Sequence, residues 1–160
     1  MKPVNDTIKA ARVRLGLSED EVSRRSGVSW NEYFDLELHP TEAFEVMRLG
    51  KLKKVLKVLG LDVLESLGIP CSYCGHAATG ANEHVLAPNE LIRQRRADLG
   101  LSEAELGGRI GFEAVAIHDM ERESGYLEER WPAELVAELA SILTVPPQLL
   151  LGVKGRRCRR

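Results

Sequence analysis

Residues 12–27, RVRLGLSEDEVSRRSG, return 84 positions later as residues 96–111, RADLGLSEAELGGRIG. The match extends without a gap in both directions, from Ile8 on Ile92 to Leu67-Gly68 on Leu151-Gly152. Self-similarity at a fixed offset indicates a duplicated structural unit. We therefore predict two copies of one domain, residues 1–69 and 89–153, with a linker at 70–88 and a basic tail at 154–160.

The pattern within each copy predicts helices only. Two Ser-x-x-Glu capping boxes, Ser18–Glu21 and Ser102–Glu105, open a second helix in each copy. A third helix is expected to begin near Ser29 or Glu113, and apolar spacing from Leu52 to Leu59 predicts a fourth. A first and a short fifth helix complete an all-α fold of about five helices per copy. We expect the first helix to be N-capped by Asn5 or Asn89, and glycines to end helices at 16, 27, 68, 100, 111 and 152.

The composition is that of a soluble globular protein. Of the 160 residues, 44% are hydrophobic and 29% are charged. Every apolar stretch is interrupted well before the roughly 18 residues of a membrane span, and the amino-terminal residues lack the apolar core of a signal peptide. The three cysteines suggest reduced thiols or a metal site, not a disulfide framework. We therefore expect a cytoplasmic protein without a membrane partner.

The repeated string R-x-x-L-G-L-S-E-x-E-[VL]-[SG], with its following glycine and apolar-x-x-Glu, resembles the phage-repressor family (Cro/CI, or XRE). The resemblance covers both copies. It implies two tandem five-helix, lambda-repressor-like helix-turn-helix domains. It also implies an internal ion pair between the first-helix arginine and the glutamate that ends the third helix, here Arg12–Glu37 and Arg96–Glu121.

In that family the third helix enters the major groove and its amino-terminal side chains contact bases. The resemblance therefore places base-reading residues in the first copy at Ser29, Trp30 and Asn31, followed by Asp35. Arg24 and Arg25 are placed to contact phosphates. Trp30 is an unusual reader: it suits an apolar or protein contact, or it packs beside Phe34.

The second copy is less suited to DNA. Its corresponding positions are Glu113, Ala114, Val115 and Asp119, and carboxylates are repelled by phosphates, although glutamate can accept from a cytosine amine. Residues 86–153 carry six Lys/Arg against twelve Asp/Glu, whereas residues 1–69 carry eleven of each. The remaining basic candidates are Arg93 and Arg95 on the first helix of this copy. The lysines at 51, 53, 54 and 57 are interpreted as a solvated helix face.

The linker contains Cys71-x-x-Cys74-Gly, with His76 and His84 nearby. Zinc prefers four nitrogen or sulfur ligands, so these four residues form a candidate zinc knuckle. One C-x-x-C alone is weak support, and free thiols in a linker rich in glycine and alanine remain an alternative.

The function expected from these residues is that of a DNA-binding transcriptional regulator that reads double-stranded DNA mainly through the first copy. The second copy is expected to act as a spacer or a dimerisation module. The alternative is a protein-interaction module, antitoxin-like or immunity-like, whose acidic second copy faces a basic, toxin-like partner. We expect no enzyme, because the familiar catalytic motifs are absent from the sequence.

Overall fold

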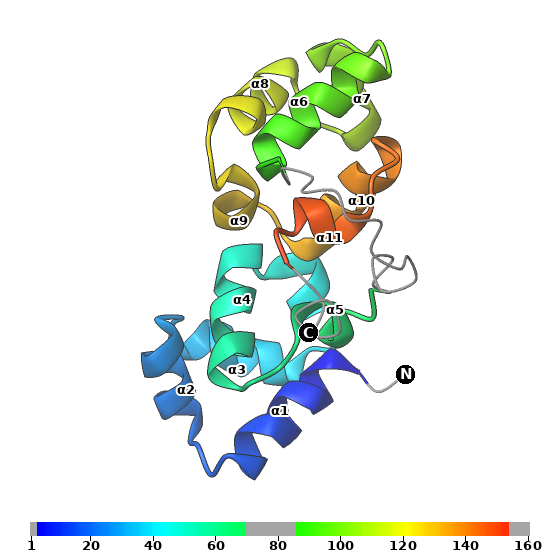
Figure 1. The fold of residues 1–160 in the computed structure, drawn as a ribbon. Coiled ribbons are helices and arrows are strands. Elements are labelled where there is room, and N and C mark those ends of the chain that lie inside the picture. The colour runs from blue at the N-terminus through cyan, green and yellow to red at the C-terminus, as the bar shows by residue number, and fades with distance from the viewer. Residues whose placement is uncertain (1–2, 70–85, 154–160) are drawn as a thin grey trace, which may run out of the picture.

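The computed structural model describes residues 3–69 and 86–153, which form an all-helical, elongated molecule (Figure 1). We call residues 3–69 the first half and residues 86–153 the second half. Within these ranges there is no strand beyond one isolated bridge. The first half contains α1 (Val4–Arg14), α2 (Glu19–Ser26), α3 (Trp30–Leu38), the π-helical turn η1 (Glu42–Val46), α4 (Leu49–Val58) and α5 (Val63–Ser66).

The second half repeats these boundaries with a shift of 84 residues. It contains α6 (Pro88–Asp98), α7 (Glu103–Ile110), α8 (Ala114–Arg122), α9 (Tyr126–Arg130), α10 (Ala133–Ile142) and α11 (Pro147–Leu150). The two Ser-x-x-Glu boxes form as predicted at Ser18 and Ser102, and α2 and α7 end at glycines with φ of 69° and 74°. Local capping signals therefore determine both ends of α2 and both ends of α7.

Two details differ from the prediction. The N-cap positions of α1 and α6 are Pro3 and Ala87, so the capping role expected of Asn5 and Asn89 is wrong. Both asparagines lie inside their helices, and their side-chain amides donate to the carbonyl oxygens of Glu37 and Glu121, each at 3.4 Å. They tie the first helix of each half to the carboxyl end of the third.

The second difference is a helical segment in each half that was not predicted, η1 in the first and α9 in the second. These two segments make the junction between the halves, because α9 packs on α4 and η1 packs on α10. The contacts are reciprocal, and Arg48 forms an antiparallel bridge with Pro132, its own counterpart 84 residues later. The halves are therefore related by an approximate two-fold axis near this bridge.

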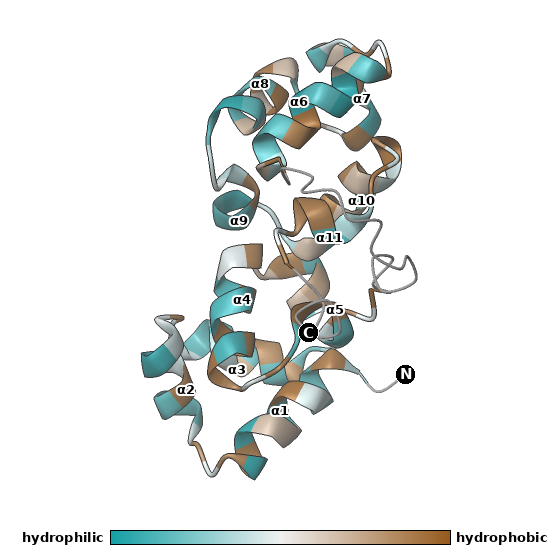
Figure 2. Ribbon diagram, viewed as in Figure 1, coloured by the Kyte–Doolittle hydropathy of each residue, from teal (hydrophilic) through white to brown (hydrophobic). Residues whose placement is uncertain are grey.

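The hydrophobic core continues through the junction. Leu49, Trp131 and Ala133 are buried there, at 0%, 3% and 0% exposure, and the Leu49 amide donates to the Trp131 carbonyl at 2.8 Å. Figure 2 shows α11, near the middle of the molecule, as largely hydrophobic and α9 as largely hydrophilic. Among the described helices, none is long and apolar enough to cross a membrane.

Candidate nucleic-acid interface

The corner between α2 and α3 presents the amino-terminal turn of α3 to solvent. Only Gly27, Val28 and Ser29 separate the two helices. Gly27 takes the left-handed conformation that ends α2, and the Ser23 hydroxyl donates to the Val28 carbonyl at 2.6 Å. Ser29 then caps α3, accepting from the Glu32 amide at 3.4 Å. The turn is thus fixed by its own backbone and by two serine hydroxyls.

A buried ion pair holds the opposite end of α3. Arg12 donates from Nε and Nη2 to the two Glu37 carboxylate oxygens at 2.6 and 2.8 Å, and the Tyr33 hydroxyl donates to Oε1 at 2.6 Å. Burial alone would raise the pKa of Glu37, but the hydrogen bonds from Arg12 and Tyr33 outweigh it and lower that pKa.

The same pair forms in the second half. Arg96 donates to Glu121 from Nε at 2.5 Å and from Nη2 at 2.8 Å. The hydrogen bond to Glu121 raises the pKa of Arg96, as the bond to Glu37 does for Arg12. Both ion pairs implied by the family resemblance are confirmed, and they orient α3 and α8 in equivalent ways.

The outer face of α3 is aromatic. Trp30 is 45% exposed and stacks on Phe34, which is 38% exposed, with ring centroids 5.0 Å apart. Leu38, one turn further, is also exposed. Trp30 therefore packs beside Phe34 without being buried by it. Asn31, next to Trp30, is exposed, whereas the Ser29 hydroxyl is already bonded to the Glu32 carboxylate at 2.7 Å.

The arginines predicted to bind phosphate differ in their exposure and in their contacts with other side chains. Arg24 and Arg25 are exposed near the end of α2, and Arg25 makes a loose contact with Glu21 at 3.6 Å. Arg93 is exposed on α6. Arg95 is partly buried and donates to the Thr144 hydroxyl at 3.0 Å and to Asp98 at 3.4 Å, so its guanidinium is directed at its own half.

The corresponding surface of α8 has a different chemistry. Glu113 makes no side-chain cap for this helix, and Val115 is 59% exposed. His118 lies 3.2 Å from the Glu103 carboxylate and 3.3 Å from an Arg122 nitrogen. This face offers an aliphatic side chain and an exposed polar network in place of the Trp30–Phe34 stack.

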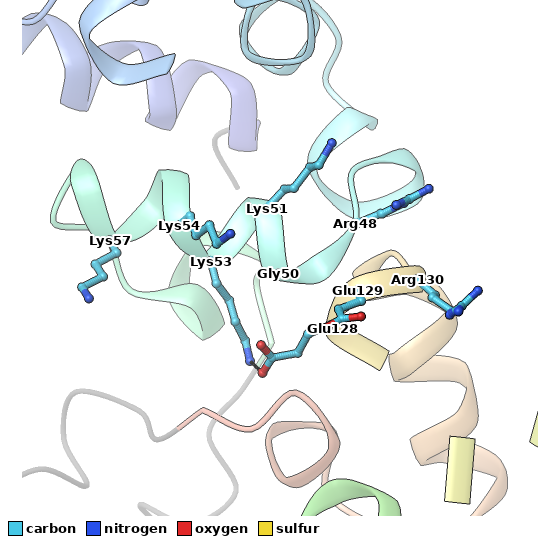
Figure 3. A pocket seen from close by; sticks show the side chains of 9 residues that line it. All are labelled: Arg48, Gly50, Lys51, Lys53, Lys54, Lys57, Glu128, Glu129 and Arg130. Carbon is cyan, nitrogen blue, oxygen red and sulfur yellow. Dashed lines mark hydrogen bonds and ion pairs between the residues drawn. The ribbon is translucent and has the colours of Figure 1, made fainter. Parts of the chain in front are cut away.

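A hollow of about 900 Å³ lies at the junction of the halves (Figure 3). We call it the junction groove. Six cations and two carboxylates contribute to its lining, which consists of Arg48, Gly50, Lys51, Lys53, Lys54, Lys57, Glu128, Glu129 and Arg130.

The junction groove adjoins the α2–α3 corner through one side chain. Glu32, in the first turn of α3, forms an ion pair with Lys51 of α4. The hydrogen bond from Lys51, followed by that from Ser29, lowers the pKa of Glu32. One carboxylate thus links the α3 N-cap to the groove wall. The lysines of α4 were interpreted from their pattern as a solvated helix face, and no signal in the sequence paired them with residues near 128.

The zinc knuckle expected at Cys71, Cys74, His76 and His84 lies outside the described residues. Within the parts of the chain that are described, no three His, Cys, Asp or Glu side chains are grouped closely enough to hold a metal ion. No family model, curated protein or solved structure matches this chain.

Proposed function

We propose that this chain is a DNA-binding transcriptional regulator of the phage-repressor type, built from two tandem helix-turn-helix domains. The first domain reads double-stranded DNA through α3. The observation that carries this proposal is the exposed first turn of α3, flanked by cations on two elements. Arg24 and Arg25 precede it on α2, and Lys51 of α4 is paired with Glu32 beside it.

Each group has a specific task in such a complex. Asn31 is exposed and can donate to and accept from an adenine edge in the major groove. Trp30 offers an apolar surface that suits a thymine methyl group. The arginines neutralise phosphates, which fixes the protein on the duplex without reading sequence. The paired arginine and glutamate of each half hold the reading helix rigid against α1 and α6.

The second half contributes little base reading in this proposal. Its third helix presents Val115 and the His118 network where the first half presents Trp30 and Asn31. Because the junction is an approximate two-fold arrangement within one chain, the second half takes the place that a second subunit would hold in a dimeric regulator. One chain can then be sufficient for one site.

The test is selection of duplexes from a random library, followed by affinity titrations at several salt concentrations. R24E/R25E should weaken all duplexes alike and lower the salt slope by about 2, one for each phosphate that the parent arginines neutralise. Arg109 occupies in the second half the position of Arg25. R25E and R109E therefore form a matched pair with the same change of charge, and R109E should change the affinity much less. N31A should relax preference at one base pair by about 5- to 150-fold.

A second function is favoured by the exposed Trp30–Phe34 stack, because exposed aromatic pairs are typical of protein interfaces. In this alternative the chain is a protein-interaction module, antitoxin-like or immunity-like, with an acidic second half that suits a basic partner. A chain that enriches no duplex from the library, even at low salt, would exclude the regulator and leave this alternative.

A further inference from the structure

The junction groove concentrates positive charge in a chain whose formal net charge is −2. Six of its nine lining residues are Lys or Arg, and two are Glu. One of those carboxylates, on Glu128, is already neutralised by Lys53, as Figure 3 shows. Lys51 is likewise paired, with Glu32 of α3. Of the two lining carboxylates, only that of Glu129 is therefore left to Arg48, Lys54, Lys57 and Arg130.

The walls of the groove are held in place by contacts between the halves. The Leu49 amide donates to the Trp131 carbonyl at 2.8 Å, and an added Cβ on Gly50 would lie 2.9 Å from the Glu128 carbonyl oxygen. Lys53 is 17% exposed in its ion pair with Glu128. The groove is thus a preformed feature, built jointly by α4 and by the α9 segment some 75 residues away in sequence.

Several cations of the groove form no ion pair within the described ranges. Arg48, Lys54 and Lys57 are exposed and form no ion pair with any residue in the described ranges. Arg130 makes a cation–π contact with the Tyr126 ring, at 5.0 Å, and no ion pair with the described part of the chain. Lysines three or four residues apart on a helix repel one another and slightly destabilise it. An anion in the groove would relieve that repulsion.

Formation of the α4 helix does not require its lysines. Helix α10 repeats the length and position of α4 in the second half, but carries Leu135, Ala137, Glu138 and Ser141 where α4 carries Lys51, Lys53, Lys54 and Lys57. The same helix is therefore made without any of the four lysines. Lys51 and Lys53 form ion pairs with Glu32 and Glu128. Lys54 and Lys57 form no ion pair within the described ranges, so a ligand would account for these two.

We infer that the junction groove binds a run of successive phosphate groups. Lysine and arginine side chains are the usual protein ligands of phosphate, and the first turn of α4 lines the groove, so its helix dipole adds to the positive potential. The phosphates belong to a nucleic-acid backbone or to a free polyphosphate chain. For the first source the inference rests on the proposed DNA binding and adds a contact outside the α2–α3 corner.

The experiment uses the full chain and two probes, inorganic tripolyphosphate by calorimetry at low salt and a duplex of about 20 base pairs in a salt titration. The test variant is K54E/K57E, with K54Q/K57Q as the milder form. The matched control is K9E/R14E, which makes the same change of net charge at two exposed positions of α1 outside the groove. Circular dichroism melting verifies that all variants remain folded.

We expect K54E/K57E to weaken tripolyphosphate binding at least about tenfold and to lower the duplex salt slope by about 2, with K9E/R14E close to the parent. Loss of tripolyphosphate binding alone would support the groove and assign it to a free polyphosphate. Equal effects of the test and control variants on both probes, or no effect of either, would overturn the inference. R24E/R25E separates the two proposals, because it should weaken the duplex and leave tripolyphosphate binding intact.

Discussion

Replacing Gly50 by alanine should loosen the junction between the two halves. The added Cβ would lie 2.9 Å from the Glu128 carbonyl oxygen and 3.4 Å from its carbonyl carbon. Both are backbone atoms, so α4 and α9 must separate by a few tenths of an ångström. Overpacking of this kind costs about 1–3 kcal/mol. Alanine gains at most about 1 kcal/mol of helix propensity, and less in a first turn, so we expect a net destabilisation of about 1–2 kcal/mol.

The measurement is urea unfolding followed by the fluorescence of Trp131, which is 3% exposed at the junction. Trp30→Phe in every protein compared leaves Trp131 as the sole tryptophan of the chain. Gly108→Ala is the control, because Gly108 lies inside α7 with nothing within 4 Å of an added Cβ. It should stabilise the protein by about 0.5–1 kcal/mol. If Gly50→Ala stabilises the chain as Gly108→Ala does, the close packing of α4 on α9 is refuted.

Three further substitutions test other contacts of the fold. Gly107→Ala should lower the free energy of unfolding by about 2–3 kcal/mol in thermal unfolding, because the added Cβ would lie 2.5 Å from the Phe112 carbonyl oxygen. A stabilisation like that expected of Gly108→Ala would contradict this. Glu37→Gln should cost about 3 kcal/mol at pH 7. The folded-state pKa of Glu37 is lowered from its ordinary value of about 4.5. The stabilisation by the Arg12–Glu37 pair is therefore complete above about pH 4.5 and is lost as the pH falls through the folded-state pKa. The stability difference between parent and variant should therefore narrow in acid, and a constant difference between about pH 6 and pH 3 would argue against the pair. Trp30→Ala should change stability by less than about 1 kcal/mol, since the side chain is 45% exposed, and yet weaken duplex binding; equal affinity of both proteins would remove Trp30 from the interface.

The parts of the fold that follow from local chemistry could be predicted from the sequence. The serine hydroxyls of the Ser-x-x-Glu boxes lie next to the helix they open, and Gly27 and Gly111 end α2 and α7 in the left-handed conformation. The duplication repeats each of these signals, which strengthens them. Asn5 shows where such reasoning fails: an asparagine near a helix start suits a cap, but its amide is used instead on the carbonyl of Glu37, 32 residues away.

The junction could not be predicted in this way. Segments η1 and α9 are five residues each and carry no side-chain cap. Their positions depend on packing against α10 and α4, which lie far from them in sequence. The lysine run of α4 is visible in the sequence, but the groove forms only where α4 packs against α9 across the junction, as in the Lys53–Glu128 ion pair. A pattern along one helix contains no information about which distant element faces it.

Comparison of the two halves separates the contacts that recur in both from the surface residues that occur in only one. The Arg–Glu pairs, the Asn amide bonds and the helix boundaries recur at the same offset. Trp30 and the α4 lysines do not recur, since Ala114 and the sequence of α10 occupy their places. The features common to both copies form the shared framework of the two halves. Among the features confined to the first half, Trp30 lies on its outer face and the α4 lysines line the junction groove, where we propose that they serve binding. For this reason Trp30 of α3 and Lys54 and Lys57 of α4 are the residues whose substitution should alter binding while the fold persists.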